Sequence, residues 1–84
     1  MEPYSVYIHL ELLDVVPRRG DQRTKIINFI RSLADDPYTP GDFTDWDANS
    51  RTRQVKIIGK YAVTYWVDDP VKSVMVVGIQ VADR

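Results

Sequence analysis

The sequence has no cysteine and a single histidine, His9, among its 84 residues. It therefore holds no disulfide, no thiolate nucleophile and no zinc–cysteine site, and a lone histidine lacks the partners of a catalytic triad or a metal cluster. No segment reaches the roughly 20 apolar residues of a membrane span. The N-terminus also lacks the basic region and small-residue cleavage site of a signal peptide. The sequence predicts a cytoplasmic protein with no metal, no cofactor and no membrane partner.

A strong excess of either charge is also missing. The chain has 11 Lys and Arg against 12 Asp and Glu, a formal net charge of −1, which argues against indiscriminate attraction to nucleic acid or anionic lipid. The charge is uneven, however, because residues 51–84 carry six basic and three acidic side chains. These cations are either solvated residues that protect strand edges or a modest surface that faces phosphates or a protein partner.

Apolar residues are abundant enough for a core. They make up 44% of the chain, which predicts one globular domain over residues 1–84. Alternation predicts a strand over residues 4–10, and residues 11–16 read as a short helical turn. A helix of about 14 residues is expected after Gly20, with Asp21 as its N-cap. The spacing predicts that the buried face of this helix comprises Ile26, Ile30 and Leu33.

The second half of the chain reads as a loop and three strands. Residues 35–52 hold two prolines and one glycine and predict a long loop, which Phe43 and Trp46 should pin to the core. Strands follow over residues 53–58, 61–67 and 72–82, joined by a Gly59-Lys60 hairpin and an Asp68-Asp69-Pro70 turn. Alternation places Tyr61, Val63, Tyr65 and Val67 on one face of the second of these strands, and it places Met75, Val77, Ile79 and Val81 on one face of the third.

These elements predict an α+β fold. The small antiparallel sheet comprises the first strand and the C-terminal three-strand meander, with one or two helices packed on one face.

The loop contains the start of a calcium-binding pattern. Asp45, Asp47 and Asn49 have the right spacing, but Ser50 stands where the sharp turn needs glycine and Lys56 where the bidentate glutamate belongs. We therefore expect these side chains to make local hydrogen bonds in the loop.

Aromatic residues of the meander offer a second kind of site. Tyr61, Tyr65 and Trp66 could stack on nucleobases. Tyr61 and Tyr65, however, share a strand face with valines, which favours a place in the core. Without further information, the residue types and their spacing do not identify this protein as an enzyme.

The stretch from Val55 to Arg84 resembles the C-terminal half of the RelE/ParE toxin superfamily. Gly59-Lys60-Tyr61 matches the family's hairpin, Asp68-Asp69 its acidic turn, and Ala82-Asp83-Arg84 its ending. The helix exit from Arg31 to Phe43 and the opening strand YSVYIHLELL extend the resemblance over nearly the whole chain.

The resemblance implies the toxin of a type II toxin–antitoxin system, neutralised by a cognate antitoxin. Such toxins inhibit growth through messenger RNA cleavage on the ribosome or through DNA gyrase. Cleavage by a 2′-hydroxyl needs cations that hold the phosphate and stabilise developing charge. The candidates for a catalytic role are Arg53, Lys56, Lys60, Tyr61 and Tyr65, and those for target binding are Arg51, Arg53, Lys56 and Lys60.

We expect one sheet face to carry Arg53, Lys56 and Lys60 toward the target, and the helix to face the antitoxin. Ala62 follows the hairpin tyrosine at a position where the nuclease members carry arginine. This departure motivates an alternative, a binding module of the same fold that has lost toxicity.

Overall fold

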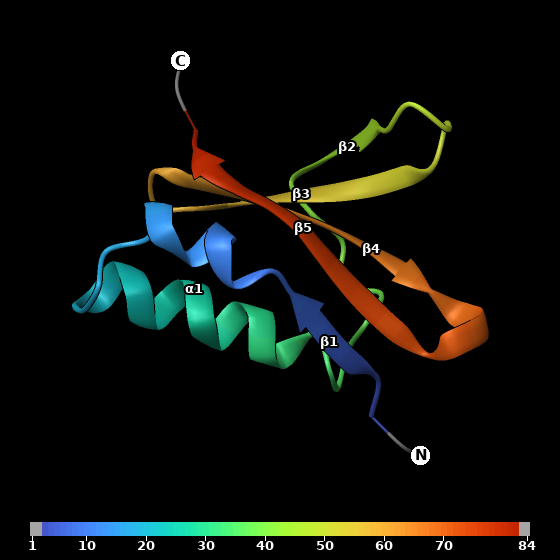
Figure 1. The fold of residues 1–84 in the computed structure, drawn as a ribbon, viewed down its shortest axis with the longest axis horizontal. Helices are drawn as coiled ribbons and strands as arrows, with labels where there is room; N and C mark the ends of the chain where they lie inside the picture. The colour runs from blue at the N-terminus through green and yellow to red at the C-terminus, as the bar shows by residue number, and fades with distance from the viewer. Residues whose placement is uncertain (1–2, 83–84) are drawn as a thin grey trace.

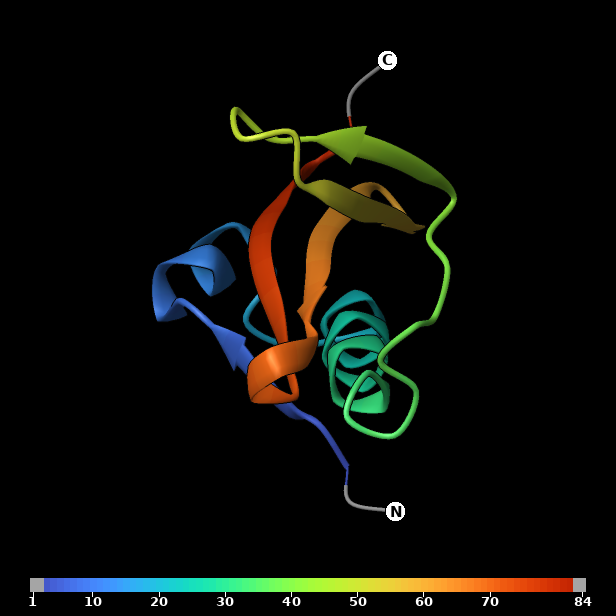
Figure 2. The same cartoon turned by 90° about the vertical axis from the view of Figure 1, so that its right-hand side faces the viewer.

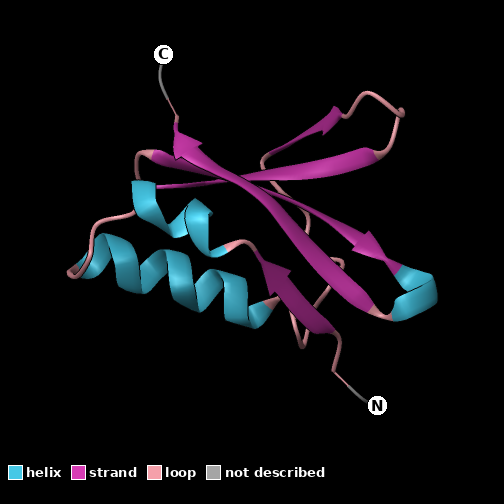
Figure 3. Cartoon of the chain, in the orientation of Figure 1, coloured by secondary structure: helices cyan, strands magenta, loops and turns pink. Residues whose placement is uncertain are grey.

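A computed structural model describes residues 3–82 of the chain (Figure 1). Its elements are β1 (Ser5–Ile8), η1 (Leu10–Val15), α1 (Asp21–Ser32), β2 (Phe43–Trp46), β3 (Thr52–Ile58), β4 (Tyr61–Asp68), η2 (Asp69–Val71) and β5 (Ser73–Val81). The five strands form one sheet in the order β1-β5-β4-β3-β2, and Figure 3 shows the short 3-10 helices η1 and η2 beside them. The predicted α+β class and the C-terminal meander are confirmed.

The first strand makes the sheet mixed rather than purely antiparallel. β1 pairs with β5 in parallel, with Ser5 opposite Ser73 and Ile8 opposite Val76, whereas every other pair of neighbours is antiparallel. A parallel pair needs a long crossover, and here the chain between β1 and β5 includes η1, α1, the strands β2, β3 and β4, and η2. β1 also ends earlier than the alternation suggested, since Leu10 begins η1 and is 79% exposed.

The core lies between α1 and one face of the sheet. The helix contributes Ile26, Ile30 and Leu33, as its spacing predicts, and they meet Val63 and Tyr65 of β4. Figure 2 shows α1 nearly end-on beside the strands. The predicted N-cap is wrong: the cap is Gly20, at φ +103° and without a side-chain hydrogen bond, and Asp21 is the first helical residue.

An edge strand occupies part of the predicted loop. β2 pairs with β3 in a register that sets Phe43 opposite Val55 and Trp46 opposite Thr52. Both aromatic rings are more than half exposed, so the prediction that they pin the loop to the core is wrong. Main-chain contacts hold the segment instead, including a 2.8 Å hydrogen bond that the Asp42 N–H donates to the Val55 carbonyl.

A β-bulge in β5 changes which valines are buried. Thr64 lies opposite Gly78 while Tyr65 lies opposite Val76, so Val77 has no partner on β4. One extra residue reverses the alternation of faces. The bulge puts Met75 on the face opposite that of Ile79 and Val81, so the prediction that Met75, Val77, Ile79 and Val81 share one face is wrong, and the buried residues of β5 are Ser73, Val74, Val76 and Ile79.

A carboxylate clamp joins three distant segments next to the β4–β5 turn. The Tyr4 hydroxyl donates a 2.9 Å hydrogen bond to Asp69 Oδ1, and the Tyr38 hydroxyl donates to the same oxygen. These hydrogen bonds, that of Tyr38 first, lower the pKa of Asp69, and the bond to Asp69 raises the pKa of Tyr38. The clamp fixes the chain before β1 and the segment after α1 against η2.

Candidate functional site

Among residues 3–82, no helix covers the face of the sheet opposite α1, which we call the open face. This open face contains a hollow. The hollow has a volume of about 670 Å³, and its walls come from β2, β3, β4 and the end of β5. The lining side chains are mainly apolar and include Phe43, Val55, Ile57, Ala62, Thr64 and Val81.

Strand register explains why the lining residues of β2, β3 and β4 share one face. Val55 lies opposite Thr64 and Ile57 opposite Ala62, while the alternate residues Ile58 and Val63 join the core beneath α1. Phe43 and Val81, at the rim of the hollow, are 54% and 55% exposed. Apolar side chains around a concave site are typical of a surface that receives another molecule.

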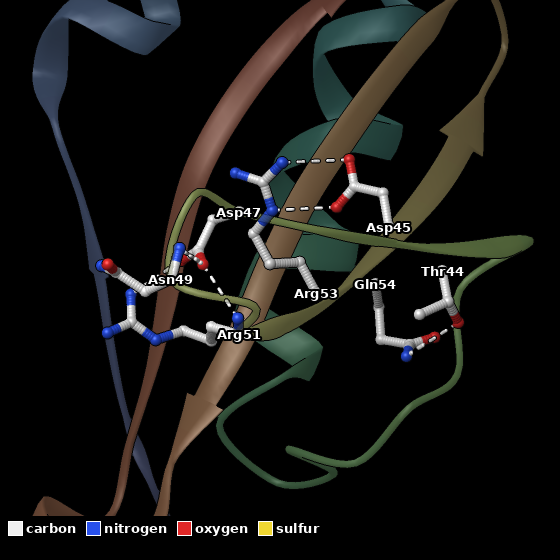
Figure 4. A network of polar contacts seen from close by, with 7 residues as sticks. All are labelled: Thr44, Asp45, Asp47, Asn49, Arg51, Arg53 and Gln54. Atoms are coloured by element: carbon white, nitrogen blue, oxygen red, sulfur yellow. Dashed lines mark hydrogen bonds and ion pairs between the residues drawn. The ribbon is translucent and has the colours of Figure 1, made fainter.

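Two arginines at the end of the open face are bound by aspartates (Figure 4). Arg53 donates to both oxygens of Asp45, at 2.8 Å from Nε and 3.0 Å from Nη2. The hydrogen bond to Asp45 raises the pKa of Arg53. Arg51 donates to Asp47 Oδ2 at 3.1 Å, and its guanidinium carbon lies 4.0 Å from the centroid of the Trp66 ring.

The acidic residues of the calcium-like pattern organise the β2–β3 turn. Asp47 Oδ1 accepts hydrogen bonds from the main-chain N–H of Asn49 at 2.8 Å and of Arg51 at 2.9 Å. The bond from the Arg51 N–H is the main cause of the lowered pKa of Asp47. The expected local hydrogen bonds are confirmed. Asp45 and Asp47 both hold arginines, and residues 3–82 contain no group of three acidic or histidine side chains that could hold a metal.

The predicted cations do not form one cluster. Arg53 and Lys56 are three residues apart in an unbroken strand, so they point to opposite faces. Lys56 lies opposite the core residue Val63, on the side of α1, with its Nζ 3.9 Å from Asp42 Oδ1. The prediction that Arg53 and Lys56 share a face is wrong, because odd spacing along a strand separates them.

Lys60 occupies the far end of β3, in the predicted hairpin. Gly59 has φ +61° there, as a two-residue turn with glycine first requires. Lys60 is exposed, its carbonyl accepts a 2.7 Å hydrogen bond from the Ala82 N–H, and no ion pair involves it among residues 3–82.

The two candidate tyrosines are core residues. Tyr61 is 7% exposed and Tyr65 is fully buried, with its ring edge-on to Phe29 at 5.5 Å. The Tyr65 hydroxyl donates a 2.8 Å hydrogen bond to the Thr39 carbonyl, and burial raises its pKa to about 12. Neither ring has a free face for a nucleobase. Their side chains act in packing, as the shared strand face with the valines indicated.

Two further features of the chain concern the functions considered from the sequence. His9 is exposed just before η1 and makes no side-chain cap. Within residues 3–82, no helix is both long and apolar enough to span a membrane.

The hollow was not predicted from the sequence, because β2 supplies one of its walls and the four residues of β2 lie in a segment rich in turn-forming residues. The one available signal was the alternation of Phe43 and Asp45 with Thr44 and Trp46.

The fold that carries this site is that of the RelE toxins, which confirms the resemblance at the level of structure. A chain of the RelE–RelB complex from Pyrococcus horikoshii OT3 superposes with a TM-score of 0.77 at 16% identity, covering 98% of both chains. A chain of the toxin–antitoxin complex RelBE2 from Mycobacterium tuberculosis gives a TM-score of 0.68 at 19% identity, over 94% of this chain and 98% of that one. No sequence profile of a known protein family matches, and no curated protein matches in sequence.

Proposed function

We propose that this protein is the toxin of a type II toxin–antitoxin pair, acting in the cytoplasm and neutralised by a cognate antitoxin. The observation that carries the proposal is the likeness in fold over 98% of the chain to a structure solved as a RelE–RelB complex. The hollow on the open face supports it independently, since it offers an uncovered apolar surface to a protein partner.

The antitoxin binds the open face in this proposal, rather than α1. The outward side of α1 is polar, with Lys25, Asn28, Arg31 and Ser32 exposed. Protein interfaces are built around apolar and aromatic anchors, and Phe43 and Val81 at the rim of the hollow fit that role better than the helix does.

Growth arrest is the direct test. The protein would be induced in cells without its antitoxin, and then together with the small protein encoded beside it. We expect arrest in the first case and recovery in the second. Normal growth while the folded protein accumulates would contradict a toxin function.

The cellular target is translation or DNA gyrase. Arg51, Arg53, Lys56 and Lys60 are the residues we propose for contact with it, and Arg53, Lys56 and Lys60 remain the catalytic candidates if the target is messenger RNA. Tyr61 and Tyr65 drop out of that set because both are buried.

Primer extension on messenger RNA in a translating extract separates the targets. Codon-spaced cuts that require ribosomes would assign an RNA-cleaving toxin. In that case a loss of about a hundredfold, usual when one contact to a developing oxyanion is removed, should follow Arg53→Ala or Lys56→Ala but not both, because the two side chains point to opposite faces of the sheet. Intact RNA, with growth arrested, would direct attention to gyrase supercoiling assays.

A specific observation favours a second candidate, a non-catalytic binding module of this fold. Arg51, Arg53 and Lys56 all contact carboxylates, and no titratable tyrosine among the candidates is exposed. Tight binding to the neighbouring gene product, without any growth defect, would support this candidate against the toxin.

A further inference from the structure

The acidic residues around β2 match the cations of β3 one for one. Asp45 lies directly opposite Arg53 in the strand register and forms a bidentate pair with it. Asp47 pairs with Arg51 at one end of that ladder, and Asp42 approaches Lys56 at the other. Each of these three cations thus faces a carboxylate from the same short segment of chain.

The geometry of these pairs is the geometry with which arginine binds phosphate. A guanidinium offers parallel N–H groups that suit either a carboxylate or two oxygens of a phosphodiester. The Arg53 pair uses Nε and Nη2 on the two oxygens of Asp45. A phosphodiester that binds Arg53 through Nε and Nη2 must therefore replace Asp45, and one that binds Arg51 through Nη1 competes with Asp47.

The segment that supplies the carboxylates is poorly fastened to the core. β2 is the outermost strand of the sheet, and Phe43, Thr44 and Trp46 are exposed. The side chains of Arg53 and Asp45 are 25% and 42% exposed, so both partners of the pair reach solvent. The carboxylates can move away without opening the cluster beneath α1, to which no residue of β2 belongs.

We propose that Asp45 and Asp47 act as an internal competitor that occupies a phosphate-binding row formed by Arg51 and Arg53. The inference rests on the proposed function, because it concerns the surface that meets the target. While Asp45 and Asp47 are paired with the arginines, the row has no net charge and does not attract the phosphates of a nucleic acid. Contact with a phosphodiester backbone requires the two aspartates to yield the arginines.

The test replaces both acids by their isosteric amides. Asp45→Asn with Asp47→Asn removes the two charges, while an asparagine oxygen at position 47 still accepts the N–H bonds of Asn49 and Arg51 that shape the turn. The matched control is Asp35→Asn with Asp36→Asn. It makes the same change in net charge at two exposed positions between α1 and β2.

The measurement is the anisotropy of a labelled 20-nucleotide single-stranded RNA at several salt concentrations, with single-stranded DNA of the same sequence as a second probe. Each phosphate neutralised adds about 0.7 to the slope of log K against log salt on a single strand. Two released arginines should steepen the slope by about 1.4 and tighten binding at least about tenfold at low salt. RNA alone responding would indicate that the row reads RNA, and a response to both that it reads the shared phosphodiester.

An unchanged slope in the Asp45/Asp47 variant would overturn the inference, and so would an equal change in the Asp35/Asp36 control. Adding Arg51→Ala and Arg53→Ala to the variant should return the slope to the wild-type value, and failure to do so would also refute it. If the double variant does not fold, Asp45→Asn alone should give half the change. Growth arrest by the wild type is read separately, so loss of this inference leaves the toxin proposal standing, and the reverse.

Discussion

Removing the Tyr65 hydroxyl tests whether this tyrosine stabilises the core or serves the target. In Tyr65→Phe the ring keeps its place in the core and its contact with Phe29. The change deletes the hydrogen bond to the Thr39 carbonyl, which anchors the segment after α1. A hydrogen bond of this kind contributes about 1 kcal/mol net. At pH 7 we therefore expect the free energy of unfolding to fall by about 1 kcal/mol and Tm by about 4–8 °C.

The pH dependence adds a second, independent signature. Burial raises the pKa of Tyr65 from its ordinary value of 10.0 to about 12 in the folded protein. Between these values the unfolded chain releases the proton and the folded protein retains it, so the stability present below pH 10 falls as pH rises. At pH 11 the wild type has lost about 1 kcal/mol through this residue. Phenylalanine cannot titrate, so the deficit of Tyr65→Phe should close near pH 11.

Urea unfolding followed by circular dichroism at pH 7 and pH 11 measures both effects. Tyr7→Phe is the control, since Tyr7 is 56% exposed, and it should behave like the wild type at each pH. A deficit that stays constant from pH 7 to pH 11 would refute the account of burial. Loss of growth arrest in Tyr65→Phe at unchanged stability would refute the structural role and return the hydroxyl to the catalytic candidates.

Four further predictions follow from the packing and the clamp. Ile30→Ala should cost about 2–5 kcal/mol by urea unfolding, because Ile30 is 7% exposed beneath the sheet; wild-type stability would show that the phase of α1 is misassigned. Gly59→Ala should cost about 1 kcal/mol, because φ is +61° there; an unchanged Tm would contradict the turn. Folding lowers the pKa of Asp69 from 3.8, so the clamp stabilises the protein above that value and its effect is lost as pH falls through the folded-state pKa. The gap between wild type and Asp69→Asn in urea midpoint should therefore be largest at neutral pH and shrink in acid, and a gap independent of pH would count against the clamp. Phe43→Ala should leave the free energy of unfolding within about 0.5 kcal/mol of the wild-type value yet weaken rescue by the antitoxin, and full rescue would place the interface elsewhere.

Local periodicity was sufficient to predict the helix, the meander and the side of β4 that faces the core. Ile26, Ile30 and Leu33 repeat at helical spacing. Tyr61 and Tyr65 alternate in phase with valines along their strand. Each pattern arises because the element buries a single face against the core. The faces of β4 were predicted correctly and those of β5 were not, because the bulge at Val77 depends on how β5 pairs with β4. Residues 74–77, Val-Met-Val-Val, are all apolar and give no sign of where the extra residue of a bulge will stand.

The candidate site was harder to predict than the fold, because its chemistry depends on what lies across a strand boundary. Residues 51–84 have an excess of positive charge when they are counted along the chain. Folding places Asp45 and Asp47 from the preceding segment against Arg53 and Arg51, and Asp42 near Lys56. The local excess is thereby neutralised by residues that the sequence assigned to a loop, and only the register of β2 on β3 reveals this.

The pairing of Arg51 and Arg53 with aspartates matters for what a likeness in fold at 16% identity implies about activity. A scaffold with α1 on one sheet face and a hollow on the other can be kept with few shared side chains, since packing requires only apolar residues in the right phase. Activity requires particular charges to be free at particular positions. In this chain Arg51 and Arg53 are held by carboxylates that can be removed without touching the core cluster. In the competition we propose, a nucleic acid reaches Arg51 and Arg53 by displacing Asp45 and Asp47, and the amide variants remove the two carboxylate charges while position 47 keeps the oxygen that shapes the β2–β3 turn.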